Sequence, residues 1–113
     1  MLSRKALAIA SLCTIVCTQA GIAAEAFNSS KVLTYSTESQ NSYIASSAMM
    51  AGLIASQNSA SQASCIDDWG AKQRDAGYAA VLDAMRRFPE HHPSAVIIAV
   101  LDKACGAFKY SKP

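Results

Sequence analysis

The hydrophobic and polar positions of this chain separate an apolar leader from a series of amphipathic helices. At the N-terminus, Arg4 and Lys5 precede an uncharged, largely apolar stretch that covers residues 6–24 and ends in small side chains. A short basic segment followed by such a stretch is typical of a secretory signal peptide. We therefore expect residues 1–24 to be cleaved and the mature chain to be exported to the periplasm.

The alternative interpretation of the leader is an uncleaved membrane anchor. A membrane-spanning helix needs about 20 predominantly apolar residues, and this stretch is interrupted by Ser11, Thr14, Thr18 and Gln19. We expect no membrane association after cleavage.

Residues 25–40 are rich in serine and threonine and predict an irregular lead-in to a helical domain that covers residues 41–113. The first helix is expected to run roughly from Glu38 to Gln57, with Ser36 or Thr37 as its N-cap. Its buried stripe is expected to contain Tyr43, Ile44, Ala48, Ala51 and Ile54.

The first helix also contains many small residues, which let another helix approach closely, so we expect it to be central or to lie at an interface. Met49 and Met50 are expected to fill gaps in the core, because methionine is flexible and apolar.

A polar linker is expected over residues 58–64, and a second helix over Gln73–Phe88, where the periodicity is strongest. Its apolar side chains recur on one helical face: Tyr78, Val81, Leu82, Met85 and Phe88.

Pro89 ends this helix, and residues 89–93 are expected to form a tight connection. The last helix is expected to run from Pro93 to about Cys105, with Gly106 as a natural stop, and to face inward with Ile97, Val100, Leu101 and Ala104. The pattern therefore predicts a small all-α domain of three to four helices.

Four cysteines occur in the chain, and two of them, Cys13 and Cys17, are expected to leave with the signal peptide. Cys65 and Cys105 remain in a compartment where disulfides persist, so we expect a bridge between them. The chain-entropy model gives about 4 kcal/mol of stabilisation for such a loop. Two free buried thiols, or a metal site with additional ligands, are the alternatives. Trp69 is expected to pack in the core near this bridge.

The charge balance excludes one class of function. The chain has ten basic and eight acidic residues, and the loss of Arg4 and Lys5 with the leader leaves the mature chain without formal net charge. Nucleic-acid binding requires a basic surface field, so no nucleic-acid partner is expected.

We find no catalytic motif in the sequence. Serines are abundant, but no acidic residue is placed to orient His91 or His92 as a general base. Adjacent histidines without a third ligand nearby do not form a metal site. We therefore expect no enzymatic activity, no metal and no cofactor.

Three segments together resemble the type VI secretion amidase-immunity (Tai-like) family. Tyr43-Ile44-Ala45, within SYIASSAMMAGLIASQ, is similar to a Gly-Tyr-Ile-x-Gly helix of that family. Cys65-Ile66-Asp67 resembles its Cys-Ile-Pro segment, with Asp67 in place of the proline. Residues 81–105, VLDAMRRFPEHHPSAVIIAVLDKAC, resemble its ending: a helix, a turn with histidine and proline, a second helix and a final cysteine.

The resemblance implies a periplasmic helical protein that binds and occludes a peptidoglycan-cleaving amidase effector. Such proteins are often dimeric, so a homodimer is among the expected states. The family's contact residues do not transfer to this chain. The linker and the turn before the last helix are expected to project from the helical body, so partner contacts are expected there, at Asn58, Ser59, Ser61, Gln62, Glu90, His91 and His92.

Two other functions stay open. SCIDDW and PSAVIIAVLDKAC are also faintly similar to acid-activated periplasmic chaperones, which are small, helical and closed by one disulfide. An envelope structural protein without a dedicated partner is the third interpretation.

Overall fold

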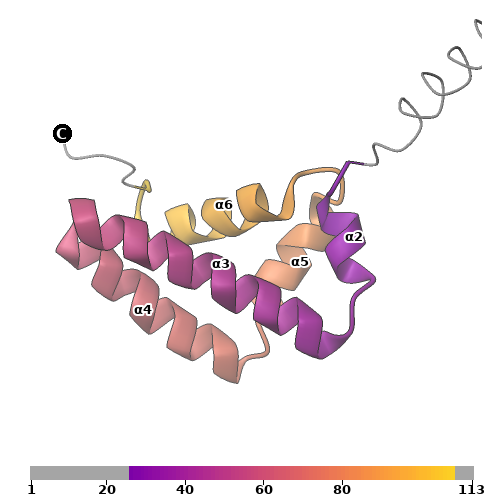
Figure 1. Ribbon diagram of the computed structural model, residues 1–113, viewed down its shortest axis with the longest axis horizontal. Helices are drawn as coiled ribbons and strands as arrows, with labels where there is room; N and C mark the ends of the chain where they lie inside the picture. Colours follow the sequence, from indigo (N-terminus) through magenta and orange to yellow (C-terminus); the bar gives the residue numbers. More distant parts are fainter. Residues whose placement is uncertain (1–25, 109–113) are drawn as a thin grey trace, which may run out of the picture.

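The computed structural model describes residues 26–108, so the signal peptide expected at residues 1–24 lies outside the described range. Within that range the all-α prediction is confirmed. Five helices follow one another along the described chain (Figure 1): α2 (Ser29–Leu33), α3 (Thr37–Asn58), α4 (Ala60–Asp75), α5 (Ala79–Arg87) and α6 (Pro93–Cys105).

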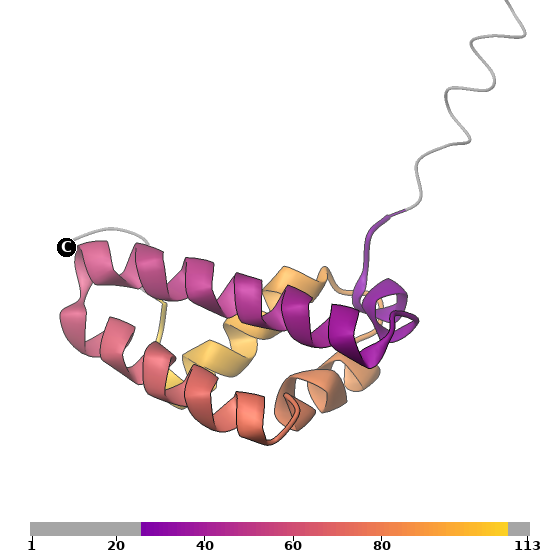
Figure 2. The ribbon, with the colours of Figure 1, turned by 60° about the horizontal axis from the view of Figure 1, so that its bottom comes forward.

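Helices α3 and α4 lie side by side as an antiparallel pair along the length of the domain (Figures 1 and 2). Helix α6 contacts both of them, α5 packs against α6, and α2 packs against α5 and α6 at one end. Each helix contributes a fully or almost fully buried side chain to one core: Val32, Ile44, Ile66, Met85 and Ile97.

Small side chains allow α3 and α4 to pack closely. Ala48, Ala51, Gly52 and Ala55 are buried along α3. A Cβ atom built on Gly52 would lie 3.4 Å from the Asp67 carboxylate of α4. The small residues that predicted a central helix therefore lie on its buried side, against α4 at Gly52 and toward α6 at Ala51.

The predicted disulfide between Cys65 and Cys105 is present, with the two Cα atoms 5.7 Å apart. It joins the first half of α4 to the last residue of α6. Trp69 lies one helical turn after Cys65 and is buried in the core, as predicted. The bridge therefore fixes the last helix to the α3–α4 pair.

The irregular lead-in expected over residues 25–40 is wrong in its described part, because α2 lies within it and α3 begins at Thr37. The side-chain oxygen of Asn28 caps α2 by accepting from the Lys31 backbone N–H at 3.1 Å. Five residues are too few for a helix to be stable alone. The backbone N–H groups of Ser29 and Ser30 donate to the carbonyls of His91 and Pro89, which anchors α2 to the α5–α6 turn.

The polar linker expected over residues 58–64 is also wrong, since α4 begins at Ala60. Ser59 alone reverses the chain. Its backbone N–H donates to the Ala55 carbonyl of α3, and its hydroxyl accepts from the Gln62 N–H of α4 at 3.3 Å. One extended serine thus serves as the C-cap of one helix and the N-cap of the next.

The continuous helix expected over Gln73–Phe88 is broken after Asp75. Gly77 and Tyr78 both adopt left-handed backbone angles, with φ of 64° and 57°. Tyr78 is nonetheless buried, so the turn directs its ring into the core. The apolar stripe belongs to the shorter helix α5, where Val81 and Met85 are fully buried.

The last helix follows the prediction closely. Helix α6 begins at Pro93 and ends at Cys105, with Gly106 at its C-cap in a left-handed conformation (φ 84°). Ile97 and Leu101 are buried and Val100 is half-buried, whereas Ala104 is exposed rather than inward-facing.

Candidate functional site

The outer face of α3 exposes large apolar side chains. Met49, Met50 and Leu53 are 74, 58 and 59 % exposed, and Ile54 is 38 % exposed. Met49 and Leu53, like Met50 and Ile54, are four residues apart and therefore adjacent on the helix surface. We call these four residues the α3 apolar face.

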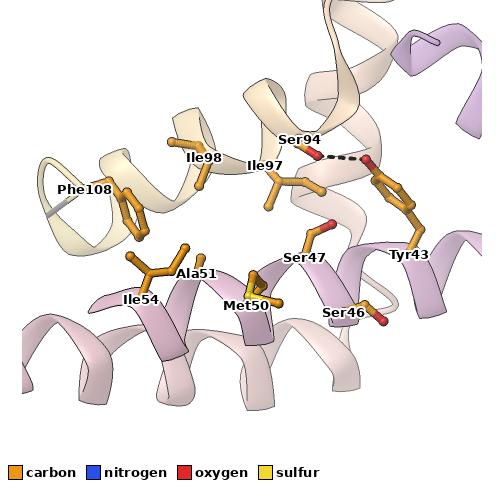
Figure 3. Close-up of a pocket in the computed structure, with 10 residues that line it drawn as sticks. All are labelled: Tyr43, Ser46, Ser47, Met50, Ala51, Ile54, Ser94, Ile97, Ile98 and Phe108. Atoms are coloured by element: carbon orange, nitrogen blue, oxygen red, sulfur yellow. Dashed lines mark hydrogen bonds between the residues drawn. The ribbon is translucent and has the colours of Figure 1, made fainter. Parts of the chain in front are cut away.

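A groove of about 400 Å³ runs beside this face between α3 and α6 (Figure 3). Met50 and Ile54 form its α3 side, and Ile97, Ile98 and Phe108 face them from α6 and the chain that follows it. Among residues 26–108, no charged side chain lines the groove. Met50 and Ile54 belong to both the α3 apolar face and the groove, so the two surfaces adjoin, whereas Met49 lies near Asp67 and Arg74 of α4.

Hydroxyl groups mark one end of this groove. The Tyr43 and Ser94 hydroxyls lie 2.9 Å apart in a hydrogen bond that joins α3 to the first turn of α6 (Figure 3). Phe27 packs edge-on against Tyr43 and His92, with ring centroids 5.8 and 5.5 Å apart. This end is thus an aromatic cluster that is held in place by α2 and α6.

The groove presents apolar side chains and hydroxyl groups. Ser46, Ser47, Ser94 and Tyr43 supply the hydroxyls, and none of the described residues that line the groove is a histidine, carboxylate or lysine that would activate them. Large exposed apolar patches on small proteins mark sites of protein association, and exposed methionines adapt to partners of varied shape.

The expected contact residues of the first cluster lie at the corner between α3 and α4. Asn58 and Ser59 are half-buried and Ser61 is exposed, but Gln62 is only 7 % exposed. The Gln62 side-chain amide donates to the carbonyls of Gly106 and Ala107, at 3.2 and 2.8 Å. Gln62 therefore has a structural role, fixing the chain after α6 to α4.

The second cluster, Glu90, His91 and His92, lies in the exposed turn between α5 and α6. This turn is at the opposite end of the domain from the α3–α4 corner (Figures 1 and 2). The His92 ring nitrogen Nδ1 accepts from the Ser94 N–H at 3.1 Å, so this histidine caps α6. The structure thus does not bring the two expected clusters together.

The α3 apolar face is not among the sites that the sequence predicts. Met49 and Met50 are expected in the core and Ile54 on the buried stripe, yet all three are exposed. Ile44, Ala48 and Ala51 are buried as predicted, and Gly52 and Ala55 complete the stripe. The usable signal is that the large apolar residues in the middle of α3 lie on more than one side of the helix, which one buried face does not require.

Within residues 26–108, no group of three or more histidine, cysteine or acidic side chains is close enough to hold a metal ion. None of the described helices has the length and apolar character needed to cross a membrane. The Cys65–Cys105 disulfide is typical of proteins from an oxidising compartment. The sequence matches no protein-family model, no curated protein and no solved structure.

Proposed function

We propose that this chain is an exported immunity-type protein that binds a peptidoglycan-cleaving amidase effector in the periplasm and occludes its active site. The observation that carries the proposal is the α3 apolar face, which continues into the uncharged α3–α6 groove. The resemblance of residues 42–105 to the Tai-like family supplies the identity of the partner.

The exposed side chains fit a tight protein contact. Fully desolvated apolar anchors at the centre of an interface provide most of its binding energy. Leu53 and Met50 project from a long, regular helix that is held by α4 and α6, so the surface is already ordered before a partner binds. Preorganisation of this kind lowers the entropic cost of association.

The acidic side chains favour this proposal over an acid-activated chaperone. An acid switch depends on carboxylates whose protonation releases native contacts. All seven acidic residues of the described chain are exposed: Glu38, Asp67, Asp68, Asp75, Asp83, Glu90 and Asp102. The contacts that the Asp83 and Asp102 carboxylates make, with Arg86 and with the Phe108 N–H, do not join two helices. The α3 apolar face, moreover, is exposed without any opening of the fold.

The test begins with affinity capture at pH 7 from a periplasmic extract of the source cells, using the disulfide-bonded mature chain as bait. The expected partner is a peptidoglycan amidase, and its hydrolysis of purified peptidoglycan should stop when one equivalent of the chain is added. Capture of many unfolded proteins near pH 3 alone, with none at neutral pH, would overturn the proposal in favour of the chaperone.

Substitution of Leu53 tests the surface itself. Leu53→Glu should weaken inhibition by about 100-fold, as expected when a central apolar anchor becomes charged. Ala80→Glu places the same charge at an exposed position of α5 and should leave inhibition unchanged. Sedimentation velocity should be run on both variants, because loss of a homodimer with full inhibition retained would assign the α3 apolar face to self-association instead.

A further inference from the structure

A second groove, between α5 and α6, differs from the first in its charge. It has a volume of about 380 Å³, within the usual range of small-molecule sites. Its floor and walls are apolar and include Ala84, Val96, Ala99 and Val100, while Arg87 and Lys103 also line it. Within residues 26–108, no carboxylate lines this groove.

The two cations of this groove have no ion-pair partner in the described part of the chain. The ion pair found there joins the neighbouring Arg86 to Asp83, at 2.7 Å. A guanidinium presents its N–H groups in a fork that matches a carboxylate. Arg87 and Lys103 therefore leave a positive, unneutralised rim beside an apolar floor.

The positions along α6 set the length of the groove. Three of the lining residues of α6 are spaced four residues apart: Ala95, Ala99 and Lys103. Residues with this spacing lie on one side of a helix. Eight residues of helix span about 12 Å, which suits an extended alkyl chain of medium length. Small side chains at Ala84, Ala95 and Ala99 leave the space that such a chain would occupy.

We propose that the α5–α6 groove binds a small anionic amphiphile, with its apolar chain along Ala95 and Ala99 and its carboxylate attracted by both cations of the rim, Arg87 and Lys103. Phe88 and His91 also line the groove, with their rings edge-on and the centroids 5.5 Å apart. This site is separate from the α3 apolar face, so the two proposals stand or fall independently.

The test is a two-dimensional NMR titration of the disulfide-bonded mature protein with decanoate at pH 7, below its micellar concentration. The shifts should be confined to residues of the α5–α6 groove. Decanol and decyltrimethylammonium, which carry the same chain without an anionic head, should bind at least about tenfold more weakly, since a charge-assisted hydrogen bond accounts for that difference.

Matched variants separate the site from general hydrophobic binding. Arg87→Gln and Lys103→Gln should each weaken decanoate binding by about fivefold or more. Arg86→Gln removes the same charge from the same helix, but outside the groove, and should change binding by less than about twofold. All three residues are exposed, so folding is not at risk.

Four results would overturn the proposal, and three of them concern how decanoate binds. They are equal binding of decanol and decanoate, equal losses in the Arg86 and Arg87 variants, or shifts centred on Met50 and Leu53 of α3. The last of these would show that the amphiphile simply follows exposed apolar surface. Absence of any shift at saturating decanoate would also reject the site.

Discussion

The Ser29 hydroxyl donates a hydrogen bond to the backbone carbonyl of His91 at 2.9 Å, across 62 positions of the sequence. Ser29 is fully buried, and its backbone N–H donates to the same carbonyl at 2.8 Å. This one oxygen therefore holds the first described helix, α2, against the turn that begins α6.

Replacement of this hydroxyl tests how strongly α2 is held. Ser29→Ala should lower the free energy of unfolding by about 1 kcal/mol, the usual net value of one hydrogen bond, as measured by urea denaturation. Ser30→Ala is the control, because the Ser30 side chain is exposed and its N–H bond to the Pro89 carbonyl is retained. Equal losses in the two variants would mean that the serine hydroxyl contributes nothing specific.

Reduction of the Cys65–Cys105 bridge should lower the free energy of unfolding by about 3–4 kcal/mol, since the unfolded chain regains the entropy of a long loop. The measurement is urea denaturation with and without a thiol reductant. The double variant Cys65→Ser, Cys105→Ser should match the reduced protein and should not respond to reductant. A reduced protein as stable as the oxidised one would contradict this prediction.

Two glycines should respond to alanine in opposite directions. Gly70 lies inside α4, and a Cβ atom there meets nothing within 4 Å, so Gly70→Ala should stabilise by about 0.5–1 kcal/mol. Gly77 has equal space but a φ of 64°, so Gly77→Ala should destabilise by about 1 kcal/mol through backbone strain. Thermal unfolding of both variants gives the comparison. A stabilising Gly77→Ala would show that the α4–α5 break adapts without cost.

Substitution of two methionines should distinguish the core from the α3 apolar face. Met85 is fully buried, and Met85→Ala should cost about 2–4 kcal/mol because it removes apolar burial and leaves a cavity. Met49 is largely exposed, and Met49→Ala should change the free energy of unfolding by less than about 0.5 kcal/mol. Similar losses at the two sites, measured by denaturant midpoints, would place Met49 in the core after all.

The sequence predicted those elements whose signals are local. Ser36 accepts from the Ser39 N–H at 3.2 Å and starts α3 at Thr37, one residue before the predicted start. Pro93 and Gly106 bound α6 because proline suits a first helical turn and glycine suits a left-handed stop. The disulfide followed from counting the cysteines that remain after the expected removal of residues 1–24.

The linker expected over residues 58–64 was wrong because Ser59 caps both neighbouring helices locally. The other wrong predictions concern segments whose structure depends on distant contacts. The α4–α5 break at Gly77 and Tyr78 lies inside an unbroken amphipathic pattern, since the pattern records only which side chains are buried. Tyr78 completes the core only if the chain turns there, so that α4 follows α3 while α5 reaches α2 and α6. Likewise α2 is too short to form without its hydrogen bonds to residues 89 and 91.

At the candidate site, too, some features follow from the sequence and others from the tertiary structure. The sequence by itself determined that the domain is helical and placed Ile44, Ala48 and Ala51 on the buried side of α3, because helical periodicity acts through neighbouring residues. The Cys65–Cys105 pair followed from the number of cysteines. Only the tertiary structure decided where the buried side of α3 ends. Helix α4 packs closely against Gly52 and helix α6 lies on the side of Ala51, and this packing leaves Met49, Met50 and Leu53 exposed. That choice depends on shape complementarity between two helices, which the sequence of either helix does not contain.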